Sequence, residues 1–177
     1  MIRADLSSMH KFDIVLVCGL PSSGKSYIAR TEFMNKGRKR ISRKEIRRFV
    51  YEMTNFGEKW SEQLFSEVDE HFIKHTERKM IEQLLTGGEK IIIVNSSLTS
   101  DSRKLYISIA ERMHKTIGVI FIDANIQGCL ARNRTLEDPI PENIITKLAV
   151  KKYLPEKREG FNSIIILTDS DFDFDDA

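Results

Sequence analysis

The sequence predicts an α/β fold with a parallel sheet of about five strands flanked by helices. Apolar segments typical of buried strands alternate with longer amphipathic segments, which is the pattern of a parallel sheet. A glycine-rich motif stands between the first strand-like segment and the first helical one. The 177 residues are enough for one domain with a substantial core. These observations together indicate a single domain of the P-loop NTPase type.

The elements of the first half follow from local composition. Residues 12–18 (FDIVLVC) are apolar and rich in β-branched side chains, so they predict a buried first strand. We expect a helix over about 24–35, a short strand over 40–42 and a helix over 44–53. A longer helix is expected from about 61 to 86, ended by Gly87 and Gly88. Its apolar stripe recurs every three or four residues and comprises Trp60, Leu64, Phe65, Val68, Phe72, Thr76, Met80, Ile81 and Leu84.

The second half continues the alternation. Strands are expected at 90–94, 117–123 and 163–167, and helices at 102–114, 125–134 and 142–153. Pro139 and Pro141 interrupt the chain before the last of these helices. We therefore expect one domain over residues 1–168. Residues 169–177 contain five aspartates and predict a flexible acidic tail, because like charges repel and few of these residues can be buried.

The overall composition excludes several classes of protein. Two distant cysteines, Cys18 and Cys129, give neither a disulfide framework nor a zinc pattern. No apolar run approaches the roughly 18–20 residues that a membrane span needs, and the first eleven residues lack a signal peptide's apolar stretch. The formal net charge is only +2. We expect a cytoplasmic protein that does not associate with membranes.

A phosphate-binding loop is the strongest functional signal. Residues 19–26 (GLPSSGKS) match G-x-x-x-x-G-K-[ST] at every fixed position. The two glycines allow the backbone N–H groups to surround a phosphate. Lys25 is expected to reach the β- and γ-phosphates, and the Ser26 hydroxyl to ligate Mg²⁺. The predicted ATP-binding residues of this loop are Gly19, Leu20, Pro21, Ser22, Ser23, Gly24, Lys25 and Ser26.

A basic segment follows the second predicted strand. Residues 36–48 hold eight basic side chains and one carboxylate, Glu45. Such a cluster either binds an anionic acceptor such as nucleic acid or is an ordinary solvated surface. Arg43, Arg47 and Arg48 are the candidate acceptor-binding residues. Glu45 either accepts the proton of an acceptor hydroxyl or forms a surface ion pair with Arg48.

Two further segments are expected near the phosphates. Asn95 and Ser96 follow a buried strand, where residues line the ligand crevice of a parallel sheet, so they either bind the acceptor or cap the next helix. Arg132 and Arg134 precede the proline-containing segment and predict a lid near residues 132–141. Mobile arginines in a lid can neutralise charge on a transferring phosphoryl group. The alternative is favourable placement of arginine at a helix C-terminus.

The chain resembles the small P-loop kinases that include phage-type polynucleotide 5′-hydroxyl kinases and seryl-tRNA kinases. The resemblance is carried by GLPSSGKS, ISRKEIRRF, NSSL and the stretch ARNRTLEDPIPENIITKLAVKKYLPEKREGFNSIIIL. It implies an adenylate-kinase-like fold, ATP as the phosphate donor, lid arginines at Arg132 and Arg134, and an acceptor-side arginine at Arg47 or Arg48.

The chain departs from this family at two positions. An aspartate three residues before the acceptor-side arginine serves as the base in polynucleotide kinases. Lys44 stands there if Arg47 is that arginine, and Glu45 if it is Arg48. Asn95 replaces the usual aspartate at the strand end.

Three functions stay open from the sequence alone. The first is an ATP- and Mg²⁺-dependent kinase that phosphorylates a nucleic-acid hydroxyl, the 5′-hydroxyl of RNA or DNA, with Lys25, Arg132 and Glu45 as the catalytic residues. The second is a kinase of a small metabolite or nucleoside, because one fold serves many acceptors. The third is a nucleotide-binding regulatory module without transferase activity.

Overall fold

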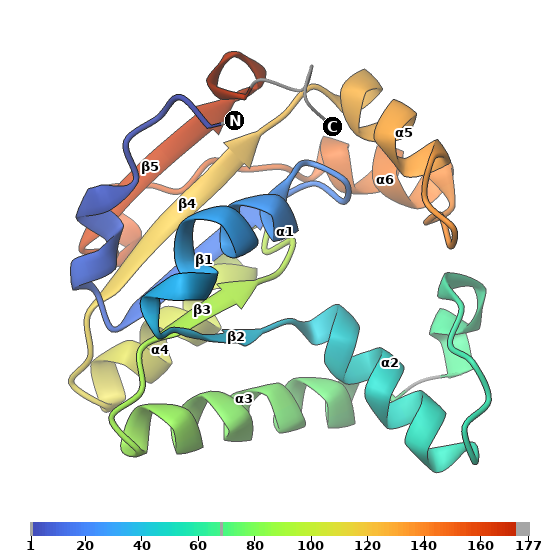
Figure 1. Cartoon of the computed structure of the whole chain (residues 1–177), viewed down its shortest axis with the longest axis horizontal. Helices are drawn as coiled ribbons and strands as arrows, with labels where there is room; N and C mark the ends of the chain where they lie inside the picture. The colour runs from blue at the N-terminus through green and yellow to red at the C-terminus, as the bar shows by residue number, and fades with distance from the viewer. Residues whose placement is uncertain (1, 68, 173–177) are drawn as a thin grey trace.

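A computed structural model describes residues 2–67 and 69–172 as five parallel strands in the order β2-β3-β1-β4-β5, with helices around them (Figure 1). The strands are β1 Ile14–Gly19, β2 Lys39–Ile41, β3 Ile91–Val94, β4 Ile117–Asp123 and β5 Ser163–Thr168. The helices are α1 Lys25–Ile28, α2 Arg43–Thr54, α3 Glu70–Thr86, α4 Ser100–Arg112, α5 Ile126–Arg134 and α6 Glu142–Val150. The predicted α/β fold and its parallel five-stranded sheet are confirmed.

The central strand β1 sets the position of the site. It pairs with β3 from Ile14↔Ile91 to Val17↔Val94 and with β4 from Ile14↔Ile117 to Gly19↔Ile122. Every residue of β1 is buried, which explains its continuous apolar composition. Because all strands run in the same direction, the carboxyl ends of β1, β3 and β4 meet at one edge of the sheet. The loops that follow them therefore lie side by side.

The helix after β1 is less regular than predicted. α1 continues as a π-helical turn over Ala29–Phe33 and a 3₁₀ turn over Met34–Lys36. The Thr31 hydroxyl donates to the Tyr27 carbonyl at 3.0 Å. A hydroxyl bonded back to the preceding turn competes with the helical hydrogen bonds and bends a helix. The segment is therefore helical over the predicted range, but after Ile28 its backbone hydrogen bonds are those of a π-helix and a 3₁₀-helix.

The predicted long helix is wrong in its first part and only partly right in its buried face, where Ile81 is buried as expected. Residues Glu62–Glu67 form a 3₁₀ turn, and α3 begins only at Glu70, where the Asp69 carboxylate accepts from two backbone N–H groups as the N-cap. The buried side chains of α3 are Ile73, Glu77, Ile81 and Leu85, whereas the predicted Phe72 and Met80 are exposed. Val68 lies outside the described residues. The buried face also contains a charged residue, Glu77, which a search for apolar periodicity passes over.

The C-terminal segment is packed as far as it is described. Asp169–Asp171 form a 3₁₀ turn, and Phe172 is buried beside the chain's other end, in an antiparallel bridge with Ile2. The expected flexible tail therefore does not begin at residue 169, and residues 173–177 lie outside the described part of the chain. No helix within residues 2–67 and 69–172 is long and apolar enough to cross a membrane.

Candidate functional site

The glycine-rich loop occupies the junction of β1 and α1, as the motif predicts. Gly19 has φ +145°, and a Cβ there would lie 2.8 Å from the Ile122 carbonyl oxygen. Gly24 has φ +103°, and Ser22 has φ +57°, a conformation that costs energy for a residue other than glycine. The Gly19 N–H donates to the Ser96 carbonyl at 3.0 Å, which joins the loop to the end of β3. Strain held in this way is typical of ligand-binding loops.

Two side chains of the loop have the properties expected of phosphate ligands. The Ser23 hydroxyl is buried and has no hydrogen-bond partner among the described residues. The Lys25 ammonium donates to the carbonyls of Gly19 and Leu20 at 3.0 and 2.5 Å. Its removal from water lowers the pKa of Lys25 to about 8. Both groups gain a strong partner if phosphate oxygens enter the loop.

The Lys25 pKa leads to a pH-dependent prediction. A bound triphosphate favours the charged ammonium, so it raises this pKa and binding takes up a proton above pH 8. We expect uptake to approach one proton at about pH 9 and affinity to fall as the pH rises through this range. Calorimetry of ATP binding in two buffers with different ionisation enthalpies measures the uptake, with Lys25→Met as the control. Equal uptake by wild type and variant contradicts the assignment.

Ser26 and Glu45 line one cavity, although they come from different elements. The cavity has a volume of about 310 Å³ and lies between α1, β2 and α2. It is lined by Ser26, Ala29, Arg30, Met34, Arg38, Arg40, Glu45 and Ile92. Glu45 forms an ion pair with Arg40 at 2.6 Å rather than with Arg48, the partner that helical spacing predicts. An exposed serine hydroxyl fits Mg²⁺, which usually takes one or two protein ligands together with substrate phosphates and water.

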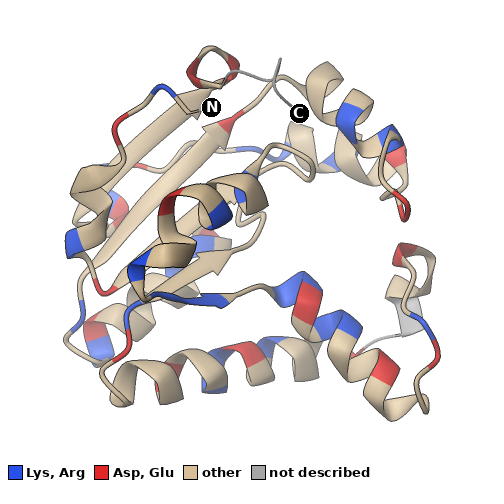
Figure 2. Cartoon of the chain, viewed as in Figure 1, with Lys and Arg blue, Asp and Glu red and all other residues tan. Residues whose placement is uncertain are grey.

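Much of the basic segment is paired within the protein, and Figure 2 shows acidic segments close to the basic ones. Lys44 pairs with Glu62 at 2.8 Å, and Arg47 pairs with Glu70 at 2.5 Å. The Arg38 guanidinium donates to backbone carbonyls, among them those of Phe12 and Ile91, near the amino end of the sheet. The segment therefore presents a weaker positive field than its composition predicts.

Arg43 and Asn95 belong to a buried network instead of an open acceptor surface. The Asn95 Oδ1 accepts from the Arg43 backbone N–H at 3.0 Å, so Asn95 caps α2. Its Nδ2 donates to Glu77 Oε1 and to the Tyr106 hydroxyl. The Arg43 guanidinium donates to Glu77 Oε2, with 2.9 Å from Nε, and to the Tyr106 hydroxyl at 3.0 Å. The Glu77 side chain is fully buried. This network joins β3, α2, α3 and α4.

Part of the segment predicted as a lid, residues 132–141, contacts the phosphate-binding loop. The Arg132 Nε donates to the Ser22 carbonyl at 2.8 Å, so this arginine reaches the phosphate-binding loop. Arg134 instead pairs with Glu142 at 2.6 Å, both side chains being largely exposed. The two arginines predicted for the lid thus have different partners: Arg132 contacts the loop, and Arg134 connects α5 to the first turn of α6.

Comparison with known proteins assigns the chain to a family. A family model described as an AAA domain matches residues 14–147, which is more than half of the chain and includes the phosphate-binding loop. The chain belongs to this AAA domain family. The matched range includes every residue that lines the cavity and also residues 132–141.

Solved structures with the same fold are diverse in what they do. A gluconokinase from Sinorhizobium meliloti has 13% sequence identity, a TM-score of 0.58, and covers 87% of this chain and 81% of its own. Chaetomium thermophilum Kti12 in complex with ADP-AlF3 has 17% identity and a TM-score of 0.63. The match covers 90% of this chain and 91% of the Kti12 chain. A chain of the Pnkp1/Rnl/Hen1 RNA repair complex has 19% identity and a TM-score of 0.60. The match covers 78% of this chain and 43% of that chain. These likenesses support a P-loop kinase-like fold and leave the acceptor open.

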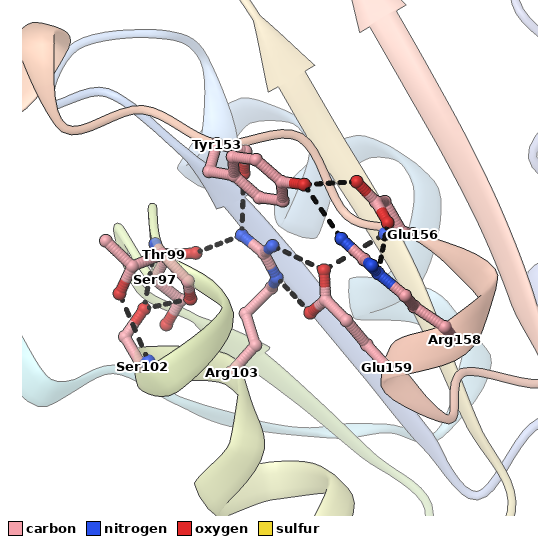
Figure 3. Close-up of polar contacts among 8 residues, drawn as sticks. All are labelled: Ser97, Thr99, Ser102, Arg103, Tyr153, Glu156, Arg158 and Glu159. Atoms are coloured by element: carbon pink, nitrogen blue, oxygen red, sulfur yellow. Dashed lines mark hydrogen bonds and ion pairs between the residues drawn. The ribbon is translucent and has the colours of Figure 1, made fainter.

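Arg103 of the AAA domain supports the loop that follows β3, a role that the sequence did not predict (Figure 3). Its fully buried guanidinium binds the two carboxylate oxygens of Glu159 at 2.7 and 2.8 Å. It also donates to the carbonyls of Ser97 at 3.2 Å and Tyr153 at 2.9 Å. Ser97 has φ +39°. One side chain therefore fixes the β3–α4 loop, the end of the α6 segment and the turn before β5.

A second residue that the sequence did not predict, Asp138, joins the α5–α6 connection to the α2–α3 connection. Its carboxylate accepts from the Ser61 hydroxyl at 3.2 Å and the Glu62 N–H at 3.0 Å. These partners are more than 70 positions apart in the sequence, and in Figure 1 the two segments approach each other at one side of the molecule. Neither contact has a local sequence signal. In contrast, Arg103 and Glu77 are recognisable as single charges within apolar helical stripes.

Loss of the Asp138 contacts is expected to open this side of the AAA domain. Trp60 is the only tryptophan, is buried beside Ser61 and packs edge-on against Tyr51 at 5.4 Å. Two hydrogen bonds are worth about 1–3 kcal/mol, so Asp138→Ala should favour separation of these two segments by roughly tenfold. Greater quenching of Trp60 fluorescence by acrylamide measures the opening. The neighbouring exposed Glu137→Ala is the control, and equal quenching in both variants contradicts the prediction.

Proposed function

We propose that this protein is an ATP- and Mg²⁺-dependent kinase that transfers the γ-phosphoryl group to a hydroxyl. The observation that carries the proposal is the shared cavity of Ser26 and Glu45. It brings the last serine of the phosphate-binding loop, in the first turn of α1, together with a carboxylate of α2. An acceptor hydroxyl in this cavity would lie between the phosphates and a proton acceptor.

Each residue has a stated part in the transfer. Lys25 and Arg132 stabilise the negative charge that spreads over the phosphoryl oxygens. Ser26 would hold Mg²⁺, which would supply positive charge beside the phosphates. The oxygen of the acceptor hydroxyl bonds to the γ-phosphorus while Glu45 takes the hydroxyl proton. The bond between the γ-phosphorus and the oxygen that bridges it to the β-phosphate breaks, and ADP leaves. Asn95 and Arg43 support α2 from within and do not contact the acceptor.

We propose a nucleic-acid hydroxyl, the 5′-hydroxyl of RNA or DNA, as the acceptor. Arg48 is exposed on α2 and has no ion pair within the described ranges, and Arg30 and Arg40 line the cavity. Arginine is the side chain best suited to phosphate groups. The resemblance to polynucleotide kinases and the shared fold with a chain of an RNA repair complex favour the same class.

A small-metabolite acceptor is the second candidate. A cavity of about 310 Å³ is at the lower end of the range for small-molecule sites. The ion pairs of Arg40, Lys44 and Arg47 reduce the charge available for a polyanion. The shared fold with a gluconokinase agrees with this alternative.

Transfer from labelled ATP to a panel of acceptors tests both candidates. The panel contains hydroxyl-ended RNA and DNA strands, nucleosides and sugars, with Lys25→Met as the inactive control. Transfer to strands that weakens steeply between about 50 and 200 mM salt supports the nucleic-acid acceptor, because each phosphate contact releases counterions. Transfer only to neutral acceptors, with a flat salt response, supports the metabolite kinase. ATP binding without transfer to any acceptor contradicts the kinase proposal and favours a regulatory nucleotide-binding module.

A further inference from the structure

One face of α2 leads directly away from the cavity. Glu45, Phe49 and Met53 are spaced by four residues, so they lie in one row along the helix, about 6 Å apart. Glu45 lines the cavity at the first position of this row. The two large apolar side chains that follow are therefore the next groups that an acceptor extending along the helix from the cavity would meet.

These two side chains are exposed although other faces of the same helix are buried. Phe49 is 66% exposed and Met53 60%, whereas Ile46 and Tyr51 are each 8% exposed. Burial of a phenylalanine or methionine side chain stabilises a fold, and these two side chains do not contribute that stabilisation. Phe56, just beyond the helix, is also fully exposed. An apolar row beside a candidate site indicates a ligand that covers it.

The chemistry of the row favours nucleobases over a folded protein. A standard protein interface needs about 800 Å² on each partner, and two side chains of this size provide well under half of that. Single strands are bound by aromatic side chains that stack on bases, beside arginines that contact the backbone. Arg48 precedes Phe49 directly and is exposed. The row therefore offers a stacking surface, and Arg48 supplies a positive charge on the adjacent flank of the helix, about 100° around its axis.

We propose that Phe49 and Met53 form a base-stacking subsite that receives the first nucleobases of a single-stranded acceptor whose terminal hydroxyl lies beside Glu45. This inference rests on the nucleic-acid acceptor proposed above and specifies how that acceptor is held. Phe49 stacks on the base nearest the reacting end, Met53 contacts the next one, and Arg48 contacts the backbone between them.

Binding of labelled single strands to the full chain tests the subsite. Fluorescence anisotropy with Mg²⁺ and a non-hydrolysable ATP analogue compares an ordinary 5′-hydroxyl strand with one that lacks its first two bases. Base–aromatic stacking is worth about 1–3 kcal/mol per base, so Phe49→Ala should weaken binding of the ordinary strand by roughly tenfold. The abasic strand should bind weakly to wild type and be unaffected by the substitution. Phe49→Trp should retain binding of the ordinary strand.

A matched control separates stacking from general loss of apolar surface. Phe72 on α3 is also about half exposed, and Phe72→Ala should leave both strands unaffected. If Phe49→Ala binds the ordinary strand as tightly as wild type, the subsite is wrong, while transfer to strands would still uphold the acceptor class. If wild type transfers phosphate to sugars or nucleosides but to no strand, the nucleic-acid acceptor is wrong and the subsite with it.

Discussion

Arg103→Ala is expected to destabilise the protein by about 3–5 kcal/mol, which is the usual cost of removing one partner from a buried ion pair. The loss leaves the Glu159 carboxylate, whose side chain is only 9% exposed, without its cation. It also removes the donor to the Ser97 and Tyr153 carbonyls. Two loops that border the phosphate-binding edge would then lose their common support.

Thermal and denaturant unfolding measure this effect. At this chain length a loss of about 1 kcal/mol in stability lowers the melting temperature by about 2–4 °C. The thermal midpoint of Arg103→Ala should therefore fall by roughly 10 °C. Arg103→Lys should recover only part of the loss, because an ammonium cannot reproduce the bidentate geometry of the guanidinium. The nearby Arg158, which pairs with Glu156 on the surface, is the matched control, and Arg158→Ala should leave the midpoint unchanged. Similar midpoints for Arg103→Ala and Arg158→Ala would contradict the supporting role of Arg103.

The features that the sequence predicted correctly are those that a short stretch of neighbouring residues specifies by itself. The strand β1 and the loop after it are specified by a continuous apolar run and by a motif of eight residues, so both can be recognised without the rest of the chain. The parallel order follows because each strand is separated from the next by a helix. Arg132 lies beside the loop, in the region expected of it, because the end of a helix before a proline-containing segment fixes its position approximately.

The features that the sequence did not predict depend on distant partners. Asn95 meets Glu77 across 18 positions and Arg43 across 52, and Asp138 meets Ser61 across 77. A count of basic residues in 36–48 takes no account of the carboxylates that neutralise them. Glu77 does carry a local signal, because it stands between Ile73 and Ile81 on one helical face. A charge in such a position requires a buried partner, and Arg43 is that partner.

Asn95→Asp is expected to destabilise the protein by about 3–5 kcal/mol at neutral pH, although aspartate is the residue expected at this strand end in related kinases. The Asn95 Nδ2 donates to a carboxylate oxygen of Glu77, which is fully buried. An aspartate cannot donate there when ionised, and it would place two negative charges in hydrogen-bonding contact. Asparagine at this position is thus explained by the glutamate on α3.

The pH dependence of this variant distinguishes charge repulsion from a simple misfit. One of two adjacent carboxylates has its folded-state pKa raised above the unfolded value, so the folded variant holds an extra proton and its stability falls as the pH rises. The free energy of unfolding, measured with denaturant, should therefore be lower for the variant than for wild type. This difference should become smaller as the pH falls from about 7.5 to about 5.5. Adding Glu77→Gln to the variant should supply an amide donor to the introduced carboxylate and recover most of the loss. A gap that does not change with pH, or a double variant less stable than Asn95→Asp, would mean that packing, and not the buried carboxylate of Glu77, selects asparagine.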